Sequence, residues 1–131
     1  MAWKFDNDRR AVYTYKMKCD AERRWLRVNA RREVIARCMA LPNVYEDYPF
    51  DDPGWTVMRH SGSRKSFAHI FERNGKIWIN VKAEPMKCIF WRDAFSSVVP
   101  AYHMNKRHWI SVILDGGMAA EDIDMLIEDS Y

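Results

Sequence analysis

The segment "SFAHIFERNGKIWINVK", residues 66–82, constrains the fold more than any other part of the chain. Two runs in which apolar residues alternate flank the dipeptide Asn74-Gly75. A two-residue type I′ turn needs a positive φ at both central residues, which Asn-Gly adopts at little cost. The segment therefore predicts a β-hairpin. "WTVMRH" (55–60) also alternates, with Trp55 and Val57 on one face, and extends the hairpin to a three-stranded antiparallel meander over residues 55–82.

Helical spacing appears on both sides of this meander. Apolar residues recur at about 3.6-residue spacing from Asp20 to Leu41, with Asp20 as a candidate N-cap and Pro42 ending the run. This stretch fits one helix, or two helices with Asn29 capping the second. Pro85 suits the first turn of a further helix, because its missing N–H is unpaired at that position anyway.

The C-terminal part adds a strand and a last helix. "WISVIL" (109–114) is apolar and β-branched, and "DGG" stops it. "AAEDIDMLIEDSY" predicts a helix that buries Ile123, Leu126, Ile127 and Tyr131. The strands are linked by hairpins and do not alternate with helices. We therefore expect an α+β fold: an antiparallel sheet of about five strands, namely the meander plus one or two C-terminal strands, with helices packed on one face.

The segment "LPNVYEDYPFDDPGW" (41–55) contains three prolines and a glycine, which predicts an irregular loop. Aromatic residues beside prolines commonly pack under the edge of a sheet, so Tyr45, Tyr48 and Phe50 are expected to be covered there. Glu46 and Asp47 are expected to cap backbone groups or to pair with Lys and Arg.

Composition narrows the class of protein. With 131 residues the chain suits one domain, and its 6 Trp, 6 Tyr and 6 Phe argue against disorder. No stretch is apolar enough to span a membrane, and the N-terminus lacks the apolar region of a secretory signal. Cys19, Cys38 and Cys88 are odd in number and far apart, as in a reduced protein. These features predict a cytoplasmic protein without a membrane-bound part.

Positive charge is concentrated near the N-terminus. Residues 1–41 carry 11 Lys and Arg against 5 Asp and Glu, whereas residues 42–131 carry 10 against 13. A basic N-terminal part can hold a polyanion, although a solvated helix face gives the same pattern. The overall pI of about 8.8 is just below the range typical of DNA-binding domains.

Three motifs together resemble the MmcQ/YjbR family: "LPNVYEDYPF", "WINVKAEP" and "PAYHMNKRHWISVILDG". The resemblance runs from about residue 29 to residue 131, and "YHMNKRHW" is its most specific part. It implies a compact α+β domain with a sheet like those of type III secretion chaperones and CyaY-like folds. Members of the family are usually named DNA-binding proteins, for a proposed double-wing surface. No catalytic activity is attached to the family.

The chain departs from the family pattern in three places. Ala101 stands where a glycine is common, so a positive φ is not expected there. Glu84 precedes Pro85 where Asp is common, and Glu is the poorer N-cap. Residues 1–28 have no counterpart. The expected organisation is therefore a basic N-terminal extension, residues 1–28, followed by a MmcQ/YjbR-like domain, residues 29–131.

The resemblance makes double-stranded DNA the leading candidate partner. A winged surface reaches phosphates with its hairpin tips, and three predicted tips are basic: "SGSRKS", "RNGK" and "NKRH". If the tips converge, weak and non-specific binding to the DNA backbone is expected. The candidate contact residues are Arg64, Lys65, Arg73, Lys76, Asn105, Lys106, Arg107 and His108.

The alternative is a binding module for a protein partner or a small anionic ligand. Aromatic and cationic side chains that converge on the open face of the sheet suit such a ligand. The candidate groove residues are Trp78, Tyr102, His103, Lys106 and Trp109.

Metal binding and catalysis find little support in the sequence. His103 and His108 have the spacing of a zinc-finger histidine pair, but the matching cysteine pair is missing. Glu46, Asp47 and His69 offer acid–base groups without any recognisable catalytic motif. We therefore expect a protein that is not an enzyme, with no metal and no cofactor.

Overall fold

The computed structural model describes residues 30–131, which form three helices and six strands. The helices are α3 (Arg31–Met39), α4 (Pro85–Ala94) and α5 (Ala120–Ser130). The strands are β1 (Val44–Asp47), β2 (Thr56–His60), β3 (Ser66–Arg73), β4 (Lys76–Lys82), β5 (Val98–Pro100) and β6 (Trp109–Ile113). The basic extension expected at residues 1–28 lies outside the described residues.

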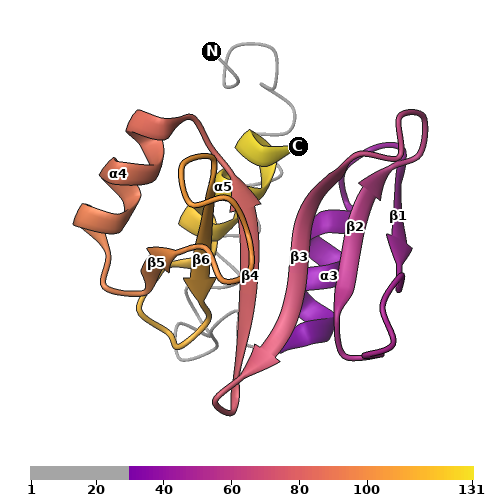
Figure 1. Ribbon diagram of the computed structural model, residues 1–131, viewed down its shortest axis with the longest axis horizontal. Coiled ribbons are helices and arrows are strands. Elements are labelled where there is room, and N and C mark those ends of the chain that lie inside the picture. Colours follow the sequence, from indigo (N-terminus) through magenta and orange to yellow (C-terminus); the bar gives the residue numbers. More distant parts are fainter. Residues whose placement is uncertain (1–29) are drawn as a thin grey trace.

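The strands form one antiparallel sheet in the order β1-β2-β3-β4-β6-β5 (Figure 1). The α+β class is confirmed, but the sheet has six strands and not about five. The expected loop at residues 41–55 contains β1, which pairs with β2 from Val44↔His60 to Asp47↔Val57. β5 is the second C-terminal strand. Both are short edge strands, whose sequences carry too few residues for alternation to show.

The β3–β4 hairpin has the turn that Asn-Gly predicts. Asn74 and Gly75 have φ values of 55° and 74°, and Arg73 pairs with Lys76 across the turn. β2 pairs with β3 along its length, which confirms the three-stranded meander. A β-bulge between Met58 and Arg59 shifts the register near the β2–β3 turn.

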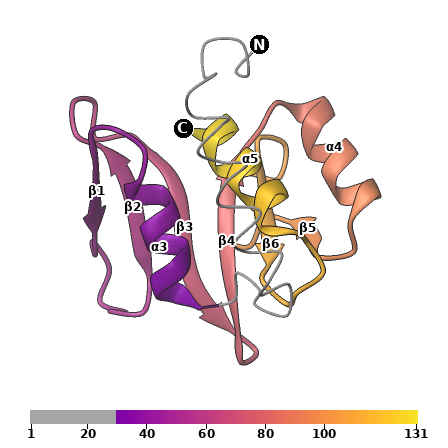
Figure 2. The same cartoon turned by 180° about the vertical axis from the view of Figure 1, so that it is seen from behind.

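Two helices cover one face of the sheet, where α3 packs against β1 and β3 and α5 against β3 and β4 (Figure 2). α4 lies beside β5 and β6 and sends Cys88 and Trp91 into the same core. The predicted burial of Ile123, Leu126 and Ile127 is confirmed, while Tyr131 is only partly buried against the core. The opposite face of the sheet carries no helix among the described residues.

Helix starts agree in part with the sequence. α3 begins after Ala30, so Asp20 and Asn29, the caps considered for a helix or helix pair over residues 20–41, lie outside the described residues. Pro85 occupies the first turn of α4 as expected. Glu84 is its N-cap residue and makes no side-chain capping bond.

The loop between β1 and β2 is only partly as expected. Tyr48 and Phe50 are 48% and 53% exposed, so the expectation that the loop aromatics plug the sheet edge is wrong for these two. Both residues lie beyond the end of the edge strand β1, and Phe50 meets Trp55 in an edge-on ring contact. Asp47 pairs with Arg59 at 2.7 Å, as expected for the acids of this segment.

Candidate functional site

The face of the sheet opposite the helices has a polar row across its centre. Strand register places Val57, His69, Asn80 and Ser111 side by side on β2, β3, β4 and β6. His69 is 8% exposed, and Asn80 and Ser111 are fully buried. Side chains of this kind are buried only when they are hydrogen-bonded, so the row depends on specific partners.

The segment between β5 and β6, residues 101–108, crosses this face and supplies partners for the row (Figure 1). Asn80 Nδ2 donates to the Tyr102 carbonyl oxygen at 2.9 Å, and Tyr102 N donates to Ser111 Oγ at 2.8 Å. Ser111 Oγ donates in turn to Asn80 Oδ1. Ala101 is buried without a positive φ, as its substitution for glycine implied. The segment of residues 101–108 is therefore anchored to the sheet at its Tyr102 end.

Aromatic side chains fill the face beside that anchor. Tyr102 lies 5.6 Å from Phe71 and 6.3 Å from Trp78 between ring centroids. The Arg73 guanidinium covers both Tyr102 and Trp78, at 4.4 and 5.0 Å. Trp78 is only 7% exposed. The groove expected around Trp78 and Tyr102 is thus occupied by these rings and by Arg73, while His103 is exposed beside them.

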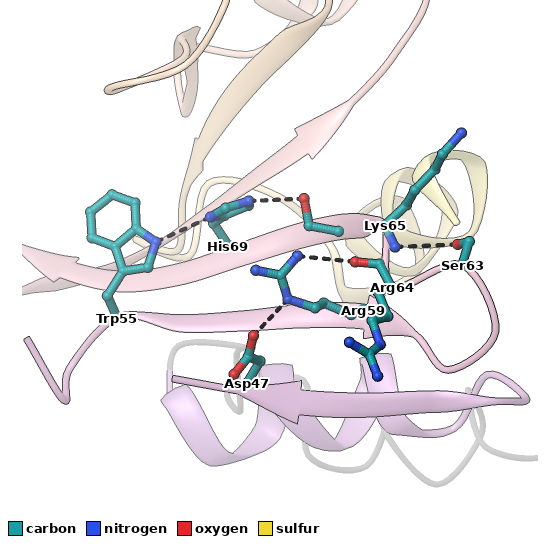
Figure 3. Close-up of polar contacts among 8 residues, drawn as sticks. Asp47, Trp55, Arg59, Ser63, Arg64, Lys65 and His69 are labelled. Carbon is teal, nitrogen blue, oxygen red and sulfur yellow. Dashed lines mark hydrogen bonds and ion pairs between the residues drawn. The ribbon is translucent and has the colours of Figure 1, made fainter. Parts of the chain in front are cut away.

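His69 contacts the rings of both Trp55 and Trp109, and Figure 3 shows its hydrogen bond with Trp55. Trp55 Nε1 donates to His69 Nδ1 at 3.1 Å, so the ring proton is on Nε2, which lies 3.2 Å from Ser66 Oγ. The Trp109 ring meets the His69 ring edge to face at 5.5 Å. Burial, and then the charges of Arg59 and Lys82, lower the pKa of His69 to about 4. Both ring nitrogens are engaged within the protein, so this histidine acts as a structural group.

The three basic tips do not lie at one end of the sheet. β3 runs from the tip that carries Arg64 and Lys65 to the tip that carries Arg73 and Lys76, which lie at opposite ends of the strand (Figure 1). Its eight residues separate the two tips by about 26 Å at the usual rise per residue. At most two of the three basic tips can therefore converge on one surface.

The turn that ends in His108 lies at the same end as Lys65. Lys82, the last residue of β4, pairs with Trp109, and Ala83 N donates to the His108 carbonyl at 2.9 Å. Lys82 lines one pocket of about 510 Å³ with Lys65 and another of about 460 Å³ with His108, and the acids Glu84 and Asp129 also line the second pocket. We call this the cationic end of the sheet; its residues are Arg64, Lys65, Lys82, Lys106, Arg107 and His108.

Asn105 shapes the turn that presents Lys106 and Arg107. Its Oδ1 accepts hydrogen bonds from Arg107 N at 2.9 Å and from His108 N at 3.2 Å. Lys106, Arg107 and His108 are exposed. Lys82 is the member of the cationic end that sequence reasoning missed, since only the pairing of β4 with β6 brings it beside His108.

No three His, Cys, Asp or Glu residues within residues 30–131 come together as a group that could hold a metal ion. His103 and His108 belong to no such cluster there. No helix in the same part of the chain is long and apolar enough to cross a membrane.

The two described cysteines are poor nucleophiles. Burial, aided by the charge of Asp124, raises the pKa of the Cys38 thiol to about 12, and burial also raises the pKa of Cys88. Because the thiolate is the reactive form, we expect a Cys19→Ser variant to show no reaction with a disulfide reagent at pH 8 while it is folded. Both thiols should react in urea. Labelling faster than global unfolding would contradict this prediction.

The YjbR family model matches residues 39–131, which include all six strands and the helices α4 and α5. The chain belongs to the YjbR family. The protein YbdF of Escherichia coli O157:H7 is 36% identical over 93 residues, covering 71% of this chain and 74% of YbdF. YyaQ of Bacillus subtilis is 31% identical over 96 residues, covering 65% and 80%. Both relatives are described as uncharacterized proteins, so their names indicate no function for this chain.

Solved structures share the fold of this YjbR chain. The crystal structure of Deinococcus radiodurans protein DR2400, with a DUF419 domain, superposes with a TM-score of 0.71 at 31% identity. The superposition covers 79% of this chain and 76% of the DR2400 chain. A protein from Pseudomonas syringae superposes with a TM-score of 0.70 at 31% identity, covering 78% and 96%.

Proposed function

We propose that this YjbR protein is a non-enzymatic cytoplasmic protein that binds double-stranded DNA weakly and without sequence preference through the cationic end of its sheet. One observation carries the proposal: Lys82 borders both the β2–β3 turn, with Lys65, and the 105–108 turn, with His108. Two turns far apart in the sequence thereby bring their cations to one strand end. Such a grouping suits a phosphate backbone, whose contacts come mainly from Lys and Arg.

The geometry favours backbone contact over the reading of bases. Bidentate recognition of adenine requires both the oxygen and the nitrogen of an asparagine side chain. Asn105 Oδ1 is already engaged by two backbone N–H groups of its own turn. Asn105 is therefore assigned to holding the turn, and Lys106 and Arg107 to phosphate contact. Arg73 and Lys76 lie at the other end of β3 and are not part of this surface.

The Lys106→Ala/Arg107→Ala double variant tests the proposal. Each lost phosphate contact should reduce the slope of log K against log salt concentration by about 1, so the double variant should lose about 2 from the slope. Fluorescence anisotropy of a labelled duplex across a salt series measures the slope.

An Arg32→Ala/Lys76→Ala double variant is the matched control, because it removes the same charge from exposed positions away from the cationic end. Its slope should match that of the unaltered protein. Equal losses in both variants would assign the effect to net charge alone. Absence of binding at about 50 mM salt, where phosphate contacts are strongest, would rule the proposal out. Binding that disappears only when residues 1–28 are deleted would assign the contact to the N-terminal extension.

A further inference from the structure

We propose that the pocket between the β2–β3 turn and the end of β4 is a binding site for a phosphate group carrying two negative charges, such as inorganic phosphate or a phosphate monoester. The pocket has a volume of about 510 Å³. The pocket is lined by Asn43, His60, Gly62, Ser63, Lys65, Lys82 and Tyr131. The pocket shares Lys65 and Lys82 with the cationic end, but Lys106 and Arg107 do not line it, so variants of those two residues test duplex binding without changing the pocket.

The two lysines of the pocket, Lys65 and Lys82, form no ion pair among residues 30–131. No carboxylate side chain lines the pocket. Burial, followed by repulsion from the charge of Lys65, lowers the pKa of Lys82. A bound dianion would relieve this repulsion and would be held by charge-assisted hydrogen bonds from both lysines.

The walls of the pocket are built before any ligand arrives. The β2–β3 turn is closed by bonds from His60 N to the Lys65 carbonyl at 2.9 Å and from Arg64 N to the His60 carbonyl at 2.8 Å. Ser61 N donates to the Asn43 carbonyl at 2.8 Å and joins the turn to the start of β1. A ligand therefore meets a preorganised site, which reduces the entropy lost on binding.

Lys82 and Ser63 are positioned by further bonds. The Lys82 backbone N–H donates to Ser130 Oγ at 2.8 Å, and Ser130 Oγ donates to the Phe67 carbonyl at 2.6 Å. Ser63 Oγ accepts from Lys65 N at 3.2 Å, which leaves the hydroxyl proton of Ser63 for a ligand oxygen (Figure 3). Gly62 has no heavy atom within 4 Å of where a Cβ would stand, so the rim beside these donors is open.

Titration with inorganic phosphate, against sodium chloride of equal ionic strength, tests the site by NMR. Saturable shifts of the Gly62, Ser63 and Lys65 amides are expected. Lys65→Gln and Lys82→Gln should each weaken binding at least about tenfold, as expected when a charge-assisted hydrogen bond is lost. Lys87→Gln is the matched control, because Lys87 pairs with Asp129 and does not line this pocket. It should leave phosphate binding unchanged, as should Lys106→Ala/Arg107→Ala.

A second arm identifies the source of the phosphate. Single-stranded oligonucleotides with and without a 5′-phosphate are compared by the same amide shifts. A preference for the 5′-phosphorylated strand identifies the end of a nucleic acid as a ligand, whereas equal behaviour together with binding of inorganic phosphate identifies a small molecule. No saturable shift up to about 20 mM phosphate, where a millimolar site is nearly full, overturns the proposal. Equal weakening by Lys87→Gln and Lys65→Gln overturns it as well. If the protein does not bind duplex DNA, the expected results of the phosphate titration and of the 5′-phosphate comparison stay the same.

Discussion

Replacement of Asn80 by alanine is expected to lower the free energy of unfolding by about 3 kcal/mol, because it leaves buried polar partners unsatisfied. Asn80 is fully buried and bonds to both the Tyr102 carbonyl and the Ser111 hydroxyl. Alanine replaces neither bond and also leaves a space in the sheet. Urea unfolding followed by tryptophan fluorescence measures the loss.

A double-mutant cycle with Ser111→Ala separates the network from general packing. Residues within one hydrogen-bond network couple by about 0.5–3 kcal/mol, whereas independent sites add. The double variant should therefore lose less stability than the two single losses summed. Amide hydrogen exchange should accelerate in residues 101–108, whose anchor is removed. Additive losses with unchanged exchange would show that the segment is held by other contacts.

Acidification from pH 7 to pH 5 is expected to remove about 2 kcal/mol of stability through His69 alone. The pKa of His69 is about 4 in the folded protein, against an ordinary value of 6.5. Between these values the unfolded chain binds a proton that the folded protein excludes. The contribution of His69 is therefore fully present above about pH 6.5 and is lost as the pH falls toward 4.

The His69→Gln variant isolates this effect from other titrating groups. Urea unfolding at pH 7 and pH 5 should show a smaller loss in His69→Gln than in the unaltered protein, by about 2 kcal/mol. His108→Gln is the matched control because His108 is exposed, and its pH dependence should follow the unaltered protein. Identical pH dependence in all three proteins would show that protonation of His69 does not lower the free energy of unfolding.

The elements found from the sequence are those with a strong local signal. Asn74-Gly75 dictates its own turn, and Ile123, Leu126 and Ile127 mark one face of α5 by their spacing. β1 and β5 could not be predicted from local sequence, because each forms a strand only through its pairing with a neighbouring strand. The pairing of Val44 with His60 joins positions that no local pattern connects.

The candidate site shows the same limit. The sequence identified the basic turns, and the strand that it predicts between Lys65 and Arg73 already places them at opposite ends. It could not show that the 105–108 turn lies at the same end as Lys65, because this depends on the pairing of β4 with β6. It also treated Trp78 and Tyr102 as the lining of a groove. The structure shows Arg73 lying over both rings, an arrangement set by side-chain packing across strands.

The two short edge strands have a consequence for association between copies of this chain. An exposed strand edge is a template for pairing with another chain, and proteins limit this risk with short edges, charges and proline. β1 has four residues, two of them the acids Glu46 and Asp47, and β5 has three residues and ends at Pro100. Neither edge offers a long row of free backbone groups. Growth of the sheet from one molecule into the next is therefore disfavoured at both sides.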